Sequence, residues 1–116
     1  MVIKRLHQFV QIFHIQIITF QLNDLSLEAF EAHVETAAPA FALLPGLDAK
    51  YWLCDPEHNS YGGVYLWRDR AAMEAYRETG LFAQLTNSTH FTQLTMRDFA
   101  LFERPTRITR GFGTPS

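Results

Sequence analysis

Two residues could serve as acid–base groups for chemistry on a small organic substrate. Asp98 is predicted to lie on a strand, with its side chain on the face of the sheet that carries no helices. Burial there would raise the pKa of its carboxyl group and suit it to act as a general base. His90 precedes the same strand, where its ring could reach the mouth of a cavity. The alternatives are that Asp98 pairs with Lys50 or Arg97 and that His90 is a surface loop residue.

Aromatic side chains on neighbouring strands could bind a flat substrate beside these two groups. Rings of this kind stack on polycyclic molecules, and nearby hydroxyl or amide groups could hydrogen-bond a substrate oxygen. The same rings could instead form only the core of a dimer. The residues predicted to bind substrate are Trp52, Tyr65, Trp67, Thr19, Gln21 and Phe102.

Hydrophobic periodicity and turn residues predict which elements position these side chains. Strands are expected at 9–22, 47–55, 61–67 and 92–103. A helix is expected at 25–44, and a second one follows Asp69 and ends with Gly80 as its C-cap. Residues 81–91 are expected to form a short helix and a loop. The order β-α-β-β-α-β predicts an α+β fold of the ferredoxin-like type, with an antiparallel sheet and both helices on one face.

The third predicted strand is apolar on both faces, which poses a covering problem. We expect Val64 and Leu66 to face the helices, and Tyr65 and Trp67 to face the other way together with Trp52. Such a patch would exceed what soluble monomers usually expose. A second copy packed sheet to sheet would cover it, giving a homodimer with an aromatic-walled cavity between the subunits.

Composition narrows the class of protein further. The 116 residues predict a single domain over 1–116, with an N-terminal extension at 1–8 and a C-terminal arm or tail at 105–116. A net charge of −2 argues against a nucleic-acid partner. The apolar run near the N-terminus is too polar for a signal sequence and too short to span a membrane. With one cysteine, Cys54, no intramolecular disulfide is possible, and we expect a cytoplasmic protein.

The sequence shows no pattern typical of a metal or nucleotide site. Its five histidines are scattered without metal-ligand spacing. Gly62 and Gly63 precede a strand rather than a helix, so we interpret them as a hairpin exit or a bulge rather than a phosphate loop. If the protein is an enzyme, we therefore expect chemistry without a cofactor.

Several stretches together resemble a known family. The segment "APAFALLPGLDAKYWLCDPEHNSYGGVYLWRDRAAMEAY", with "RDFALFERPT" further on, resembles the YdhR-like monooxygenases of the dimeric α+β-barrel superfamily, which are related to the antibiotic-biosynthesis monooxygenases. The resemblance spans roughly residues 15–111, and residues 1–14 depart from it. It implies a ferredoxin-like homodimer and a monooxygenase. Together with the lack of cofactor motifs, this leads us to expect a cofactor-independent monooxygenase.

The substrate of such an enzyme would be an aromatic or polyketide-like small molecule. An electron-rich phenol or enol, once deprotonated, can react with O2 itself, so the protein need only orient it, exclude water and supply a base. Two alternatives use the same fold. One is a non-catalytic dimer that binds small molecules, and the other is a non-oxidative cyclase or isomerase.

Overall fold

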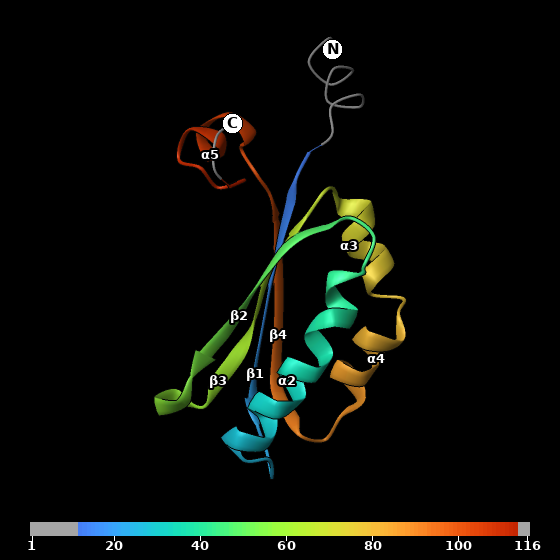
Figure 1. Ribbon diagram of the computed structural model, residues 1–116, viewed down its shortest axis with the longest axis vertical. Coiled ribbons are helices and arrows are strands. Elements are labelled where there is room, and N and C mark those ends of the chain that lie inside the picture. Colours follow the sequence, from blue (N-terminus) through green and yellow to red (C-terminus); the bar gives the residue numbers. More distant parts are fainter. Residues whose placement is uncertain (1–11, 114–116) are drawn as a thin grey trace.

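The computed structural model describes residues 12–113, which form one antiparallel four-stranded sheet and a layer of helices (Figure 1). The strands have the spatial order β2-β3-β1-β4, which is the ferredoxin-like order, so the predicted fold class is confirmed. The elements are β1 (His14–Leu22), α2 (Leu27–Ala42), β2 (Leu47–Asp55), the 3-10 helix η1 (Pro56–His58), β3 (Ser60–Trp67), α3 (Arg70–Tyr76), α4 (Gly80–Asn87), β4 (Phe91–Ala100) and α5 (Glu103–Ile108).

Side-chain caps fix where the helices begin. The Ser26 hydroxyl accepts a hydrogen bond from the Ala29 N–H at 3.1 Å and starts α2. The Asp69 carboxylate accepts one from the Ala72 N–H at 2.8 Å and starts α3. The prediction that Gly80 caps a helix C-terminus is wrong: Thr79 is the N-cap of α4, and Gly80 is the first residue of that helix.

Helices α2, α3 and α4 cover one face of the sheet, which we call the helix face (Figure 1). The core lies between this face and the helices. The opposite face, which we call the open face, carries no helix from this layer. The core residues are Ile18, Phe20, Phe30, Tyr61, Tyr65, Trp67, Met73 and Tyr76.

The predicted orientation of the aromatic residues is wrong. Trp67 is fully buried, and its ring stacks parallel to Tyr65 at 5.9 Å and lies 5.3 Å from Tyr76 of α3. Tyr65 and Trp67 therefore point toward the helices, and Trp52 contacts Phe41 of α2. The alternation of side chains then places Val64 and Leu66 on the open face. When both faces of a strand are apolar, the alternation alone does not tell which one the helices cover.

The predicted orientation of β4 is also reversed. Asp98 pairs with Gln16 of β1. Gln16 lies two residues before the buried Ile18 and points to the same face, so the side chain of Asp98 also lies on the helix face. Phe99 pairs with Ile15 and lies on the open face, where 42% of its surface is exposed. A register shift between Thr19 and Gln21 marks an irregularity at the start of β4.

The chain after β4 turns into the short helix α5, where the sequence suggested an arm or tail. The strand ends at Ala100, and α5 lies at one end of the sheet, away from the helix layer (Figure 1). Phe102 precedes α5 and is 84% exposed. The predicted N-terminal extension at 1–8 lies outside the described residues, as do 114–116. Within residues 12–113, no helix is long and apolar enough to cross a membrane.

Candidate functional site

A pocket of about 530 Å³ lies between the helix face of the sheet and helices α2 and α4. It is built within one chain, and its wall is mostly apolar and aromatic, as is usual for a site that binds small organic molecules. None of its lining residues is a carboxylate. The polar residues that line it are His33, Lys50, Gln84, Asn87, Ser88 and His90.

Lys50 lies in an aromatic cage in the wall of this pocket. Its Nζ is 3.4 Å from the centre of the Phe41 ring, 3.3 Å from that of Trp52 and 4.5 Å from that of Tyr65. The three rings come from α2, β2 and β3. From the sequence, Lys50 was considered only as a possible partner for Asp98. Its position two residues before Trp52 was the signal that it would share the site.

Burial lowers the pKa of the Lys50 amine to about 7, because the ammonium loses water of hydration in the apolar pocket. The faces of the three rings oppose this effect, since their negative electrostatic potential favours the cation. Near neutral pH, Lys50 therefore populates both the ammonium and the neutral amine, which is a nucleophile and a base.

Gly62 and Gly63 allow the backbone and Lys50 to pack closely. A Cβ on Gly63 would lie 2.9 Å from the Cε of Lys50, and one on Gly62 would lie 1.9 Å from the carbonyl oxygen of Ile18. Gly62 also has φ +156°, which disfavours residues with a side chain. The pairing of β3 with both neighbours is regular at these positions, so the interpretation as a bulge is wrong.

Two phenols continue the aromatic wall beneath the pocket. The hydroxyl groups of Tyr65 and Tyr76 lie 3.3 Å apart, within hydrogen-bonding distance. Burial raises the pKa of both, and the neighbouring Tyr76 hydroxyl raises that of Tyr65 further. Both phenols therefore stay protonated at neutral pH. Of the two, Tyr65 lines the pocket, where it can donate a hydrogen bond.

His90 also lines the pocket, although this pocket lies under the helices and not between two subunits, where the cavity was predicted. Its Nδ1 is 3.0 Å from the carbonyl oxygen of Asn23, so Nδ1–H donates to that oxygen. In the neutral ring this leaves Nε2 as an acceptor, able to take a proton. Its role as a catalytic group stays a prediction.

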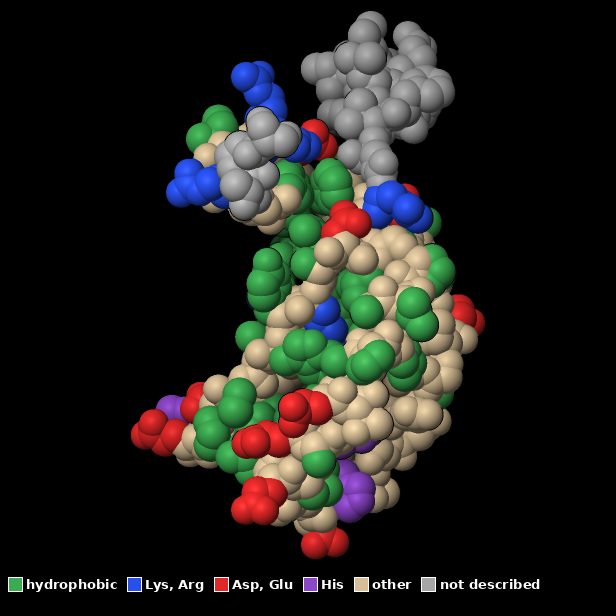
Figure 2. Space-filling model, in the orientation of Figure 1, with side chains coloured by type: hydrophobic (Ala, Val, Ile, Leu, Met, Phe, Trp, Pro, Cys, Tyr) green, Lys and Arg blue, Asp and Glu red, His purple; other side chains and the backbone are tan. Residues whose placement is uncertain are grey.

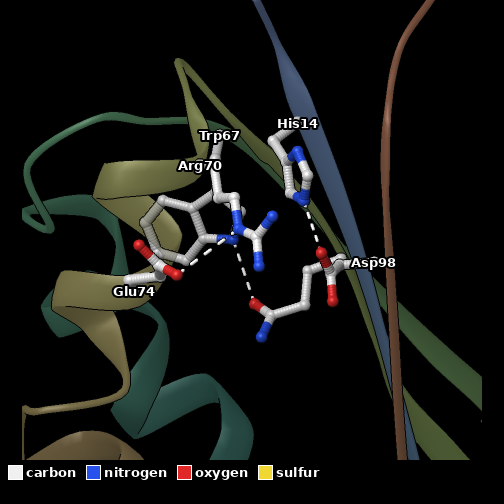
Figure 3. Close-up of polar contacts among 6 residues, drawn as sticks. His14, Trp67, Arg70, Glu74 and Asp98 are labelled. Carbon is white, nitrogen blue, oxygen red and sulfur yellow. Dashed lines mark hydrogen bonds and ion pairs between the residues drawn. The ribbon is translucent and has the colours of Figure 1, made fainter.

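Asp98 lies elsewhere, next to His14 and α3 (Figure 3). The Nε2 of the buried His14 is 2.5 Å from Oδ2 of Asp98. This hydrogen bond lowers the pKa of Asp98, with smaller contributions from the charges of His14, Arg70 and Arg77. The prediction of a raised pKa is therefore wrong, and Asp98 is not among the residues that line the pocket.

Trp67 and Gln16 form a second buried contact beside this pair. The indole N–H of Trp67, which is labelled in Figure 3, donates to Oε1 of Gln16 at 3.0 Å. Both side chains are buried. Trp67 does not line the pocket, but its ring supports Tyr65 from behind. Its indole is therefore placed to hold the wall of the pocket rather than to touch a ligand.

The other predicted binding residues lie on or beyond the open face. The Thr19 hydroxyl is hydrogen-bonded to that of Thr95, and Gln21 follows on the same face. Phe102 precedes α5. The pocket thus brings together Trp52, Tyr65 and His90 from the predicted set, and it adds Lys50 and Phe41.

The family model described as "Putative mono-oxygenase ydhR" matches residues 15–112. The chain belongs to this family. The match includes every residue that lines the pocket, whereas His14, the partner of Asp98, lies just before it. The resemblance seen in the sequence is thereby confirmed. No curated protein is similar enough to count as a match.

Solved structures share the fold of this ydhR-family chain at low sequence identity. A protein of unknown function from Nitrosomonas europaea is 14% identical, with a TM-score of 0.66 over 79% of this chain and 91% of that one. A point mutant of SnoaB, a cofactor-independent oxygenase from Streptomyces nogalater, is 20% identical, with a TM-score of 0.62 over 78% and 94%. A protein from Shewanella oneidensis is 11% identical, with a TM-score of 0.66 over 79% and 93%.

Proposed function

We propose that this chain is a cofactor-independent monooxygenase that acts on a flat aromatic or polyketide-like molecule. The observation that carries the proposal is the pocket between the sheet and helices α2 and α4, with its aromatic wall and few polar groups. Membership of the ydhR family supports the reaction class. SnoaB, a cofactor-independent oxygenase with a similar fold, supports the absence of a cofactor in the proposed reaction.

The lining residues suit a substrate that supplies its own electrons to O2. His90 Nε2 or the neutral amine of Lys50 would accept a proton from a phenol or enol. The resulting oxyanion would be stabilised by the Tyr65 hydroxyl or by the Lys50 ammonium. If the substrate carries a ring CH2 next to the phenol, one atom of O2 becomes the oxygen of a carbonyl group at that carbon. The other leaves as water with the two hydrogens, so no external reductant is needed.

The test is oxygen uptake by the purified, metal-free protein with a panel of quinols and polycyclic phenols. The matched variants are Trp52→Ala, which removes part of the pocket wall, and Leu43→Ala, which alters a residue that is 84% exposed. We expect turnover by the wild type and by Leu43→Ala, and a loss of about tenfold or more in Trp52→Ala. No turnover by the wild type above Trp52→Ala, across the whole panel, would contradict the proposal.

The same assay separates the two other functions. Substrate conversion under argon would indicate a cyclase or isomerase. Tight binding of panel members without chemical change would indicate a binding protein, a reading favoured by the absence of any carboxylate among the pocket's lining residues.

We also propose that the protein is a homodimer that forms through the open face. That face carries apolar side chains from all four strands, and Figure 2 shows hydrophobic side chains along the hollow between α5 and the tip of the β2–β3 hairpin. Covering them would contribute about 25 cal/mol per Å² before the costs of association. The apolar residues of this face that are exposed or partly exposed within one chain are Ile15, Ile17, Tyr51, Leu53, Val64 and Phe99. A monomer by light scattering at micromolar concentration would refute the dimer.

A further inference from the structure

We propose that the pocket is a covalent site for apolar aldehydes and ketones, which Lys50 captures as a reversible imine. This activity needs no oxygen and is independent of the monooxygenase reaction. The ligand class follows from the chemistry of the wall: an amine nucleophile at the end of an aromatic cage selects a carbonyl group attached to a flat, apolar body.

The position of Lys50 provides the geometric argument. Its stem lies over Gly63, where a Cβ would meet the Lys50 Cε at 2.9 Å, and its amine lies among three rings. No ion pair or hydrogen bond in the described part of the chain holds Nζ. Lys50 lines the pocket. Every fully enclosed side-chain nitrogen within residues 12–113 has a hydrogen-bond partner, so Nζ of Lys50, which has none, is not fully enclosed. The amine is therefore open to a molecule in the pocket.

None of the groups that face Lys50 in the pocket carries a negative charge at neutral pH. Phe41 and Trp52 carry no charge, and the phenol of Tyr65, like that of Tyr76 behind it, stays protonated at neutral pH. The other titratable residues that line the pocket are His33 and His90. With no carboxylate in the lining, nothing there stabilises an ammonium as an ion pair would, and burial leaves a substantial fraction of the amine unprotonated.

The reaction is balanced without any further reagent. The amine lone pair forms a C–N bond to the carbonyl carbon, and a proton moves from nitrogen to the carbonyl oxygen. The hydroxyl group then leaves as water together with the second proton of the nitrogen, and a C=N double bond forms. Solvent water supplies the proton that converts this neutral imine into the protonated imine. The protonated imine is a planar cation, which the faces of Phe41, Trp52 and Tyr65 can stabilise as they do the ammonium. The apolar pocket keeps water from hydrolysing it quickly.

The sequence supplies an internal control, because it contains only two lysines, Lys4 and Lys50. The full-length protein is incubated at pH 7 with 2-naphthaldehyde and cyanoborohydride, which reduces an imine to a stable secondary amine. Peptide mass mapping then measures the labelling rate of each lysine and of the terminal amine. We expect Lys50 to be labelled about tenfold or more faster than Lys4, because burial leaves far more of the Lys50 amine unprotonated than in an ordinary lysine.

Three comparisons decide the result. In urea, the ratio of Lys50 to Lys4 labelling should fall to near one, and 2-naphthalenemethanol, which fills the pocket without reacting, should slow Lys50 alone. Lys50→Arg, whose guanidinium stays protonated and is not a nucleophile at this pH, should fold and give no adduct at that position. Equal labelling of the two lysines in the native protein, or a ratio unchanged by urea, would overturn the proposal. Labelling runs under argon, so its failure and that of the oxygenase assay are separate results.

Discussion

The amine of Lys50 lies 3.3 Å from the centre of the Trp52 ring. The two residues are two positions apart on β2 and share one face of that strand. The lysine therefore folds back over its own strand instead of extending into solvent. Trp52 has two roles in this arrangement, since it forms part of the pocket wall and also holds the one amine in that wall. Changes at either residue should affect both ligand binding and the charge of the pocket.

Replacing Lys50 with methionine should remove a pH dependence of stability. The folded pKa of Lys50 is lowered to about 7 from 10.5, so between these pH values the unfolded state binds more protons. The free energy of unfolding of the wild type should then rise with pH by up to about 1.4 kcal/mol per unit from this group. Urea denaturation of both proteins at pH 7 and pH 9 measures the difference. Parallel slopes would contradict a buried, neutral Lys50.

Gly63→Ala should displace Lys50 without unfolding the protein. The new Cβ would lie 2.9 Å from the Lys50 Cε, which can move because it belongs to a flexible side chain. We expect the labelling of Lys50 relative to Lys4 to fall several-fold, with a small loss in thermal stability. Gly80→Ala is the matched control, since its Cβ would meet no atom within 4 Å. An unchanged labelling ratio in Gly63→Ala would show that Lys50 does not depend on this close approach.

Asp98→Asn should reduce stability but not the chemistry of the pocket. The folded pKa of Asp98 is lowered by His14, so its carboxylate stabilises the protein above the unfolded pKa, and this contribution disappears as pH falls through the folded pKa. The loss seen by denaturation at pH 6 should therefore vanish in acid. Asp48→Asn, at an exposed position, is the control. A large loss of oxygen uptake in Asp98→Asn alone would indicate that the catalytic centre is the His14–Asp98 pair and not the pocket.

Phe99→Glu should weaken self-association, because it places a charge in the middle of an apolar surface that a partner would cover. Phe99 is 42% exposed within one chain, so the substitution should not disturb folding. Leu43→Glu, at a residue that is 84% exposed beyond the end of α2, is the control. Sedimentation velocity should show a lower mass for Phe99→Glu only. The same mass for both variants would argue against an interface on the open face.

The sequence predicted the elements more reliably than their orientation. The strand at 47–55 was predicted with its observed bounds, and Asp69 caps a helix as expected, because turns and caps depend on neighbouring residues. In β3, by contrast, Val64 and Leu66 are as apolar as a core requires, and so are Tyr65 and Trp67 on the other face. The orientation is decided by the contacts of Phe41 with Tyr65 and of Tyr76 with Trp67. Phe41 and Tyr76 belong to other elements, so the strand sequence alone does not reveal these contacts.

The site was predicted only in part, because its geometry also depends on contacts between different elements. Trp52, Tyr65 and His90 meet in the pocket, although the pocket lies under the helices and not between two sheets. Asp98 was misplaced because its pairing with β1 depends on register, which no local pattern fixes. Lys50 was overlooked because a lysine on a strand ordinarily extends to solvent. Its cage is completed by Phe41, which comes from a different element.

Helices α2 and α4 put the pocket on one side of the sheet, while the open face lies on the other. Two subunits joined through their open faces would therefore stand back to back, with their pockets turned outward and widely separated. Each chain would hold one ligand without borrowing a side chain from its neighbour. A mixed dimer with one disabled subunit should keep half the capacity of the intact pair, and occupation of one pocket should leave the affinity of the other unchanged.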